Sequence, residues 1–184
     1  MTSARILPPP VETMTAVQRK IYDETSKVLG GPLGPRMVLL KHQEIAQKWS
    51  DLAAVLKAAS FPASVRELVI LLAARYWDAE FEWYAHEPNA VKAGLPHAVI
   101  EAVRHRQTPE FADDMHRAVY NYVTSLLNKH SVDDEVYRCA QEALGELGLI
   151  ELTVLLGHYS NVALTLIAHR VPLPDGVRSP FAAN

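Results

Sequence analysis

Apolar side chains recur at helical spacing along almost the whole chain, and no segment shows the strict alternation typical of a strand. The clearest run, within residues 109–129, comprises Phe111, Met115, Val119, Tyr122, Val123 and Leu126. This spacing places apolar side chains on one face of a helix. Glycine and proline interrupt the periodicity at short intervals, as in Gly94-Leu95-Pro96. The sequence therefore predicts an all-α fold of about eight helices joined by short links.

The expected helices cover residues 13–29, 42–59, 68–76, 78–94, 96–106, 109–129, 135–143 and 148–169. Expected N-caps are Thr13, Asp78 and Ser131, because side chains of these types bond the free N–H groups of a first helical turn. Ser64 and Glu67 have the spacing of a capping box. Residues 30–35 are expected to stop the first helix.

The chain has 184 residues, which is enough for one domain with a substantial core. We expect a single domain over residues 1–184, with residues 1–12 as an extended arm and residues 175–184 as a loose tail. Hydrophobic residues make up 49% of the chain and charged residues 21%, which is globular rather than disordered usage.

The formal net charge of -3 argues against a basic surface, so no nucleic acid partner is expected. The longest apolar stretch, residues 147–168, is interrupted by Glu151, His158 and Asn161, and falls short of the roughly 18–20 apolar residues of a membrane span. The N-terminus lacks the pattern of a secretory signal. We therefore expect a cytoplasmic protein that does not enter a membrane.

Cys139 is the only cysteine, so the chain can form neither an internal disulfide nor a Cys-x-x-Cys redox motif. It lies in a segment with helical periodicity. A lone cysteine in such a segment is typically a small packing residue.

The densest group of polar and aromatic side chains lies in residues 80–88. Glu82 and His86 are four residues apart and share one face of a helix. A carboxylate beside an imidazole fixes its tautomer and suits acid–base chemistry. The alternative is an exposed helix pair with no function. Glu67 could join them only if the chain folds back near residues 77–78, because a continuous helix would separate it from His86 by about 28 Å.

A metal site could use Glu82 and His86, with Glu67 or His158 as a third ligand. No His-Glu-x-x-His or similar spacing supports it, so we expect neither a metal nor a cofactor. His158 lies in an apolar segment, where its ring needs a polar partner. It is either a core histidine with that partner or a catalytic one.

Several motifs, in order, resemble the carboxymuconolactone decarboxylase family, which includes the AhpD-like alkylhydroperoxidases. They are Val65-Arg66-Glu67-Leu68-Val69-Ile70-Leu71, Glu82-Trp83-Tyr84-Ala85-His86, Ala93-Gly94-Leu95-Pro96 and Gly157-His158-Tyr159 followed by Val171-Pro172-Leu173-Pro174. The resemblance covers nearly the whole chain. It implies an AhpD-like helical fold that assembles into homotrimers or homohexamers, with pockets near the subunit contacts.

In the AhpD-like branch, the resemblance implies a relay of a glutamate, two cysteines and a histidine. The glutamate and histidine match Glu67 and His86, whereas the cysteine positions fall on Ala79 and Glu82. A thiol peroxidase needs a thiolate nucleophile, which this motif lacks. The resemblance therefore favours the decarboxylase branch.

That branch implies decarboxylation of a carboxylated lactone from aromatic-compound breakdown, which leaves an enolate to be protonated. His86 would transfer the proton, oriented by Glu82 or Glu67. Candidates to bind the substrate are Arg66, Arg75 and Arg36 for its carboxylates, with Trp83, Tyr84 and His158 in the pocket wall. Two alternatives stay open: a non-catalytic oligomeric binder of small ligands, and a peroxidase that uses Cys139.

Overall fold

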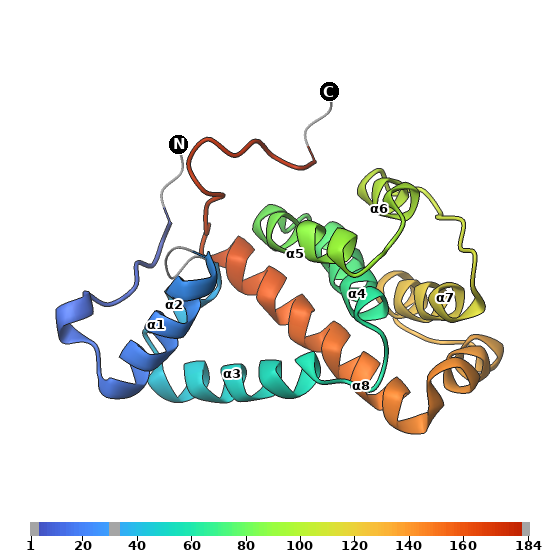
Figure 1. The fold of residues 1–184 in the computed structure, drawn as a ribbon, viewed down its shortest axis with the longest axis horizontal. Coiled ribbons are helices and arrows are strands. Elements are labelled where there is room, and N and C mark those ends of the chain that lie inside the picture. The colour runs from blue at the N-terminus through green and yellow to red at the C-terminus, as the bar shows by residue number, and fades with distance from the viewer. Residues whose placement is uncertain (1–3, 30–33, 182–184) are drawn as a thin grey trace. The chain divides into compact units, whose positions relative to one another are not determined.

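The structure is a computed structural model that describes residues 4–29 and 34–181. Within these residues it contains eight α-helices, one short 3-10 helix at Val11–Thr13, and no strand. The helices are α1 (Ala16–Leu29), α2 (Arg36–Leu39), α3 (Gln43–Lys57), α4 (Ala63–Tyr76), α5 (Glu80–Lys92), α6 (His97–Arg104), α7 (Asp114–Lys129) and α8 (Asp134–Ala168) (Figure 1). The all-helical prediction is confirmed.

The chain divides into two compact units. The first comprises Met1–Ala58 and Leu164–Pro172, and thus holds α1, α2, α3 and the end of α8. Its small core is formed by Ile21, Leu40 and Ala46. The arm contacts this unit, because the backbone N–H and the guanidinium of Arg5 donate to the carbonyls at residues 169 and 168.

The second unit comprises Ala59–Ala163 and Leu173–Asn184, and α4 is its central helix. Helix α4 packs against α5, α6 and α7 (Figure 1). Every residue from Leu68 to Ala74 is buried, on all sides of the helix. A helix that is apolar all round is one that a domain encloses. The side chains from Leu68 to Ala74 are therefore held firmly by their surroundings.

Several predicted helix starts are wrong by a few residues. Helix α1 begins after Thr15, not Thr13, where Thr15 and Gln18 exchange the two hydrogen bonds of a capping box. Asp113 caps α7 through the N–H of His116, so this helix begins at Asp114 and not at residue 109 as expected. Ser131 lies three residues before α8 and does not begin it.

The two helices expected at residues 135–143 and 148–169 form one long element with a break at Gly145. The backbone there has φ 71° and ψ 172°, which glycine adopts without steric cost. The expected stop at residues 30–35 lies largely outside the described residues, which resume at Gly34 and continue into the short helix α2. Helix α8 is long and apolar enough to cross a membrane by length and composition, a test that core helices also pass.

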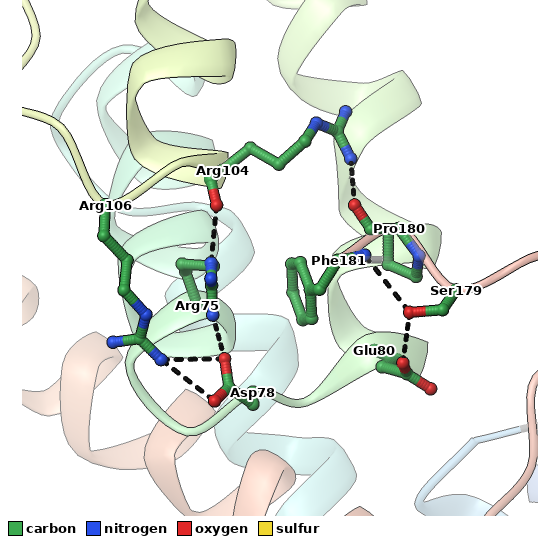
Figure 2. A network of polar contacts seen from close by, with 8 residues as sticks. All are labelled: Arg75, Asp78, Glu80, Arg104, Arg106, Ser179, Pro180 and Phe181. Atoms are coloured by element: carbon green, nitrogen blue, oxygen red, sulfur yellow. Dashed lines mark hydrogen bonds and ion pairs between the residues drawn. The ribbon is translucent and has the colours of Figure 1, made fainter. Parts of the chain in front are cut away.

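Residues 179–181, in the segment expected to be a loose tail, contact the second unit. The Ser179 hydroxyl donates to Glu80 at the start of α5, and Arg104 of α6 donates to the Pro180 carbonyl (Figure 2). The Phe181 ring packs edge-on against Trp83 with centroids 5.4 Å apart. These contacts hold the end of the described chain on α5 and α6.

Truncation of a valine on α4 should destabilise the second unit, whereas truncation on the surface of α5 should not. Val69→Ala removes two fully buried carbons, so we expect the free energy of unfolding to fall by at least about 1.6 kcal/mol, plus a cavity term. Val91→Ala, at an exposed position, is the matched control and should change it by less than about 0.5 kcal/mol. Urea unfolding followed by tryptophan fluorescence measures both. Equal losses would contradict the central position of α4.

Candidate active site

The chain reverses direction between α4 and α5 through a left-handed residue, Asp78, with φ 54°. The N–H of Ala79 bonds the carbonyl of Ala74, and the N–H of Asp78 bonds that of Arg75. This is the Schellman pattern of a helix C-terminus, with aspartate where glycine is usual. The Asp78 carboxylate accepts from Arg75 and from Arg106 (Figure 2). The fold-back expected near residues 77–78 is thus present, but Asp78 ends α4 and does not cap α5, whose N-cap is Ala79.

The reversal brings Glu67 of α4 and His86 of α5 together. Glu67 Oε2 lies 2.8 Å from His86 Nδ1. A carboxylate can only accept, so the contact places the proton on Nδ1 and leaves Nε2 with its lone pair. Glu67 is buried, whereas the His86 side chain keeps 20% of its surface exposed. The imidazole is therefore fixed on one side and accessible to a ligand on the other.

The capping-box interpretation of Glu67 is wrong. The N-cap of α4 is Pro62, which has no side chain to bond the first turn, and Ser64 lies inside the helix. Glu67 instead bonds His86 and also accepts from Arg66 Nε at 3.3 Å. Its carboxyl group therefore joins two helices and an arginine.

Glu82 lies one helical turn before His86 and is almost completely buried, with 1% of its surface exposed. Neither carboxyl oxygen has a hydrogen-bond partner among the described residues, so Glu82 does not orient His86 here. Burial raises the pKa of Glu82 well above its usual range. Burial therefore favours the neutral, protonated form of this side chain over its carboxylate.

Tyr159 of α8 completes the surroundings of His86. The two rings meet edge to face with centroids 5.0 Å apart, and the ring of the buried His158 lies 5.3 Å from that of Tyr159. The sequence pattern pointed to His158 and not to Tyr159, although both stand in the same Gly157-His158-Tyr159 motif. The residue of this motif that contacts the His86 ring is Tyr159.

The three arginines proposed for substrate carboxylates lie in different places. Arg66 is beside Glu67, and therefore close to His86. Arg75 is held by Asp78 and by the carbonyl of Arg104, and its guanidinium lies 4.6 Å from the Phe181 ring centroid (Figure 2). Arg36 belongs to the first unit, where it lies 5.3 Å from the Trp49 ring centroid. Only Arg66 has a described contact with the Glu67–His86 pair.

The two aromatic candidates on α5 differ in exposure. Trp83 is fully buried; its Nε1 donates to Glu87 Oε2 at 2.9 Å, and the Arg104 guanidinium covers its ring at 4.9 Å. Tyr84 is partly exposed and packs edge-on against Phe81. Both residues have a packing role in the described contacts, and neither has one with His86.

The described residues contain no group of three or more His, Cys, Asp or Glu side chains placed as metal ligands would be. Cys139 lies on α8, where its thiol is 3.7 Å from Glu135. The groups around His86 are thus the Glu67 carboxyl group that bonds its ring and, one helical turn before it, the buried Glu82 side chain with a raised pKa.

The raised pKa of Glu82 should be visible in the pH dependence of stability. Because the pKa is raised in the folded state, that state binds the proton more tightly than the unfolded chain. The stabilisation is full below the ordinary value of 4.5 and is lost as the pH rises toward the folded pKa. We expect Glu82→Gln to remove this decrease in the free energy of unfolding, whose slope is at most about 1.4 kcal/mol per pH unit.

The measurement is urea unfolding at a series of pH values above 4.5. Glu146→Gln, at an exposed position on α8, is the control and should leave the profile as in the unmodified protein. If Glu82→Gln and the unmodified protein show parallel profiles, Glu82 is ionised in the folded state and this description of the site is wrong.

The fold is similar to those of two solved structures. One is a protein of unknown function from Agrobacterium tumefaciens whose suggested role is that of the antioxidant defence protein AhpD; it is 15% identical, with a TM-score of 0.66, and the match covers 74% of this chain and 95% of that one. The other is the debrominase Bmp8, solved as a cysteine-to-alanine variant with 2,3,4-tribromopyrrole; it is 13% identical, with a TM-score of 0.77, and the match covers 97% of this chain and 95% of that one.

No model of a known protein family matches the sequence, and neither does any curated protein. The structural likeness, at low sequence identity, establishes the fold and not the reaction. The chain has an AhpD-like helical fold.

Proposed function

We propose that the protein is a cytoplasmic acid–base enzyme that decarboxylates a small carboxylated or lactone-type metabolite from aromatic-compound breakdown, without a cofactor. The observation that carries this proposal is the 2.8 Å contact between Glu67 and His86, made by side chains of two different helices. A base oriented by a buried carboxylate is a recurring arrangement for proton transfer. The similarity of the fold to a debrominase supports an enzymatic role.

In the proposed reaction the C–C bond to the departing carboxylate breaks, and its electron pair stays on the substrate as an enolate. Carbon dioxide leaves, and the enolate carbon takes a proton. His86 transfers that proton, and Glu67 positions its ring. Glu82 supports this chemistry because it is buried one turn away, where burial raises its pKa and favours the protonated form.

Arg66 is the arginine best placed to bind a substrate carboxylate, because it already lies against Glu67. Tyr159 would form one wall of the pocket beside the imidazole. Trp83 and Arg75 both contact the ring of Phe181 in the C-terminal segment, and through this contact they would support the site.

A non-catalytic small-ligand binder is the alternative from another class. It would use the same surroundings of His86 without proton transfer. A peroxidase is disfavoured by the chemistry of the chain, since a cysteine relay needs two thiols and Cys139 is the only one.

Substitution of the pair should abolish activity without unfolding the protein. We expect His86→Ala and Glu67→Gln each to lower kcat at least about 100-fold, because general acid–base catalysis contributes about 100-fold or more. Purified protein is screened against carboxylated lactones, with release of carbon dioxide as the measurement. His97→Ala, on the exposed start of α6, is the matched histidine control.

If the unmodified protein decarboxylates a lactone and His86→Ala does so at the same rate, His86 does not transfer the proton and the proposal is wrong. Ligand binding without turnover, unchanged by His86→Ala, would favour the binder.

We also propose that the protein is a homotrimer or homohexamer. Leu147, Ile150 and Val154 are exposed on α8 at intervals of three and four residues, so they form one apolar stripe. Such stripes are typical of contacts between subunits.

Light scattering on the purified protein should give a mass three or six times that of the 20.4 kDa chain. Ile150→Lys should lower this mass, because it places a charge in the contact, whereas Val91→Lys on α5 should not. A monomer at tens of micromolar would contradict the proposal.

A further inference from the structure

A second cluster of catalytic residue types lies where α4 begins and α7 begins. His116 Nε2 is 3.0 Å from Ser64 Oγ, and His116 Nδ1 is 2.8 Å from both carboxyl oxygens of Asp113. Both distances are those of hydrogen bonds, so the serine, histidine and aspartate side chains are linked in series. None of the three residues contributes to the Glu67–His86 pair.

The position of each side chain follows from the helix ends. Asp113 is the N-cap of α7, and its carboxylate accepts from the backbone N–H of His116 as well as from the ring. The ring of Phe111 stacks over the imidazole, with planes 15° apart. Ser64 lies in the first turn of α4. The imidazole is thus held between a helix cap and a serine of another helix.

Asp113 is suited to orient the histidine. The backbone N–H of His116 holds the pKa of Asp113 below its usual range, so the group is a carboxylate at neutral pH. It therefore accepts the Nδ1 proton, and Nε2 accepts the proton of Ser64. A serine hydroxyl with a base on one side, and a third group that fixes the base, has the geometry of an activated nucleophile.

The start of α4 also offers donors for a developing negative charge. Val65 and Arg66 donate their backbone N–H groups to Pro62, whereas those of Ala63 and Ser64 have no backbone acceptor among the described residues. Free N–H groups of a first helical turn can stabilise an oxyanion next to the serine. The cluster is accessible to solvent, since 17% of the His116 side chain and 54% of the Asp113 side chain are exposed.

We propose that Ser64, His116 and Asp113 form a second, nucleophilic site that hydrolyses small activated esters. Ser64 Oγ bonds to the ester carbonyl carbon while His116 takes its proton. The carbon–oxygen bond to the leaving group breaks, and the leaving group receives that proton. Water, deprotonated by His116, then attacks the acyl-serine, which releases the carboxylic acid and restores the hydroxyl.

Activated esters are the substrate class that fits this site. A phenolate leaves with little assistance, whereas an amine leaves only with full protonation and strong oxyanion binding. Because Ser64 is partly buried and the Phe111 ring lies beside His116, we expect acetyl esters to react faster than long-chain esters.

The experiment uses p-nitrophenyl acetate as substrate and a fluorophosphonate as a covalent probe on the full-length protein. The probe forms an oxygen–phosphorus bond at the nucleophile and releases fluoride, and peptide mass spectrometry locates it. We expect modification at Ser64, and a decrease of at least about tenfold in protein-dependent hydrolysis for Ser64→Ala and His116→Gln. Ser131→Ala, which removes an exposed serine before α8, is the matched control and should hydrolyse at the unmodified rate.

Two further variants keep the test decisive if Ser64→Ala or His116→Gln does not fold. Asp113→Asn retains a good N-cap but removes the charge, and should lower hydrolysis at least about tenfold. Ser64→Cys retains a nucleophile and should react with iodoacetamide faster than Cys139. Modification elsewhere than at Ser64, or equal hydrolysis by Ser64→Ala or Asp113→Asn, would show that the cluster only joins α4 to α7 and would overturn the proposal.

Discussion

The left-handed turn at Asp78 determines the candidate site. It ends α4, reverses the chain and sets α5 against α4, so that residues 19 positions apart come within hydrogen-bond distance. A non-glycine residue in this conformation carries a steric cost, which aspartate bears better than most side chains. The two arginines on its carboxylate hold the turn in place. Without that reversal, Glu67 would be a buried carboxyl group with no histidine.

The second constraint is the burial of two glutamates in different environments. Glu67 has an imidazole and a guanidinium within reach, whereas Glu82 has no partner among the described residues. The environment, rather than the residue type, therefore makes Glu67 a group that orients the imidazole and raises the pKa of Glu82.

The fold itself does not choose between reactions. Proteins related by this helical arrangement include a debrominase and a protein whose suggested role is antioxidant defence. In this chain the side chains that could carry a reaction project from α4 and α5, and from α7 at the start of α4. Both clusters use α4, the most enclosed helix of the second unit, because an enclosed helix fixes the side chains that it carries.

Helical periodicity and the glycine and proline positions were sufficient to predict the all-helical fold and most helix positions. The Glu82–His86 spacing and the family-like motifs also placed the candidate site near residues 67–86. The sequence could not decide the role of Glu67, since its spacing from Ser64 fitted a capping box and its approach to His86 depended on a reversal of the chain. The helix start at Pro62 removes the capping box, and the turn at Asp78 brings Glu67 to His86. It also gave no sign of Tyr159 beside His86, or of Ser64 beside His116. Such contacts join residues from distant segments, and their geometry depends on how helices pack rather than on local sequence.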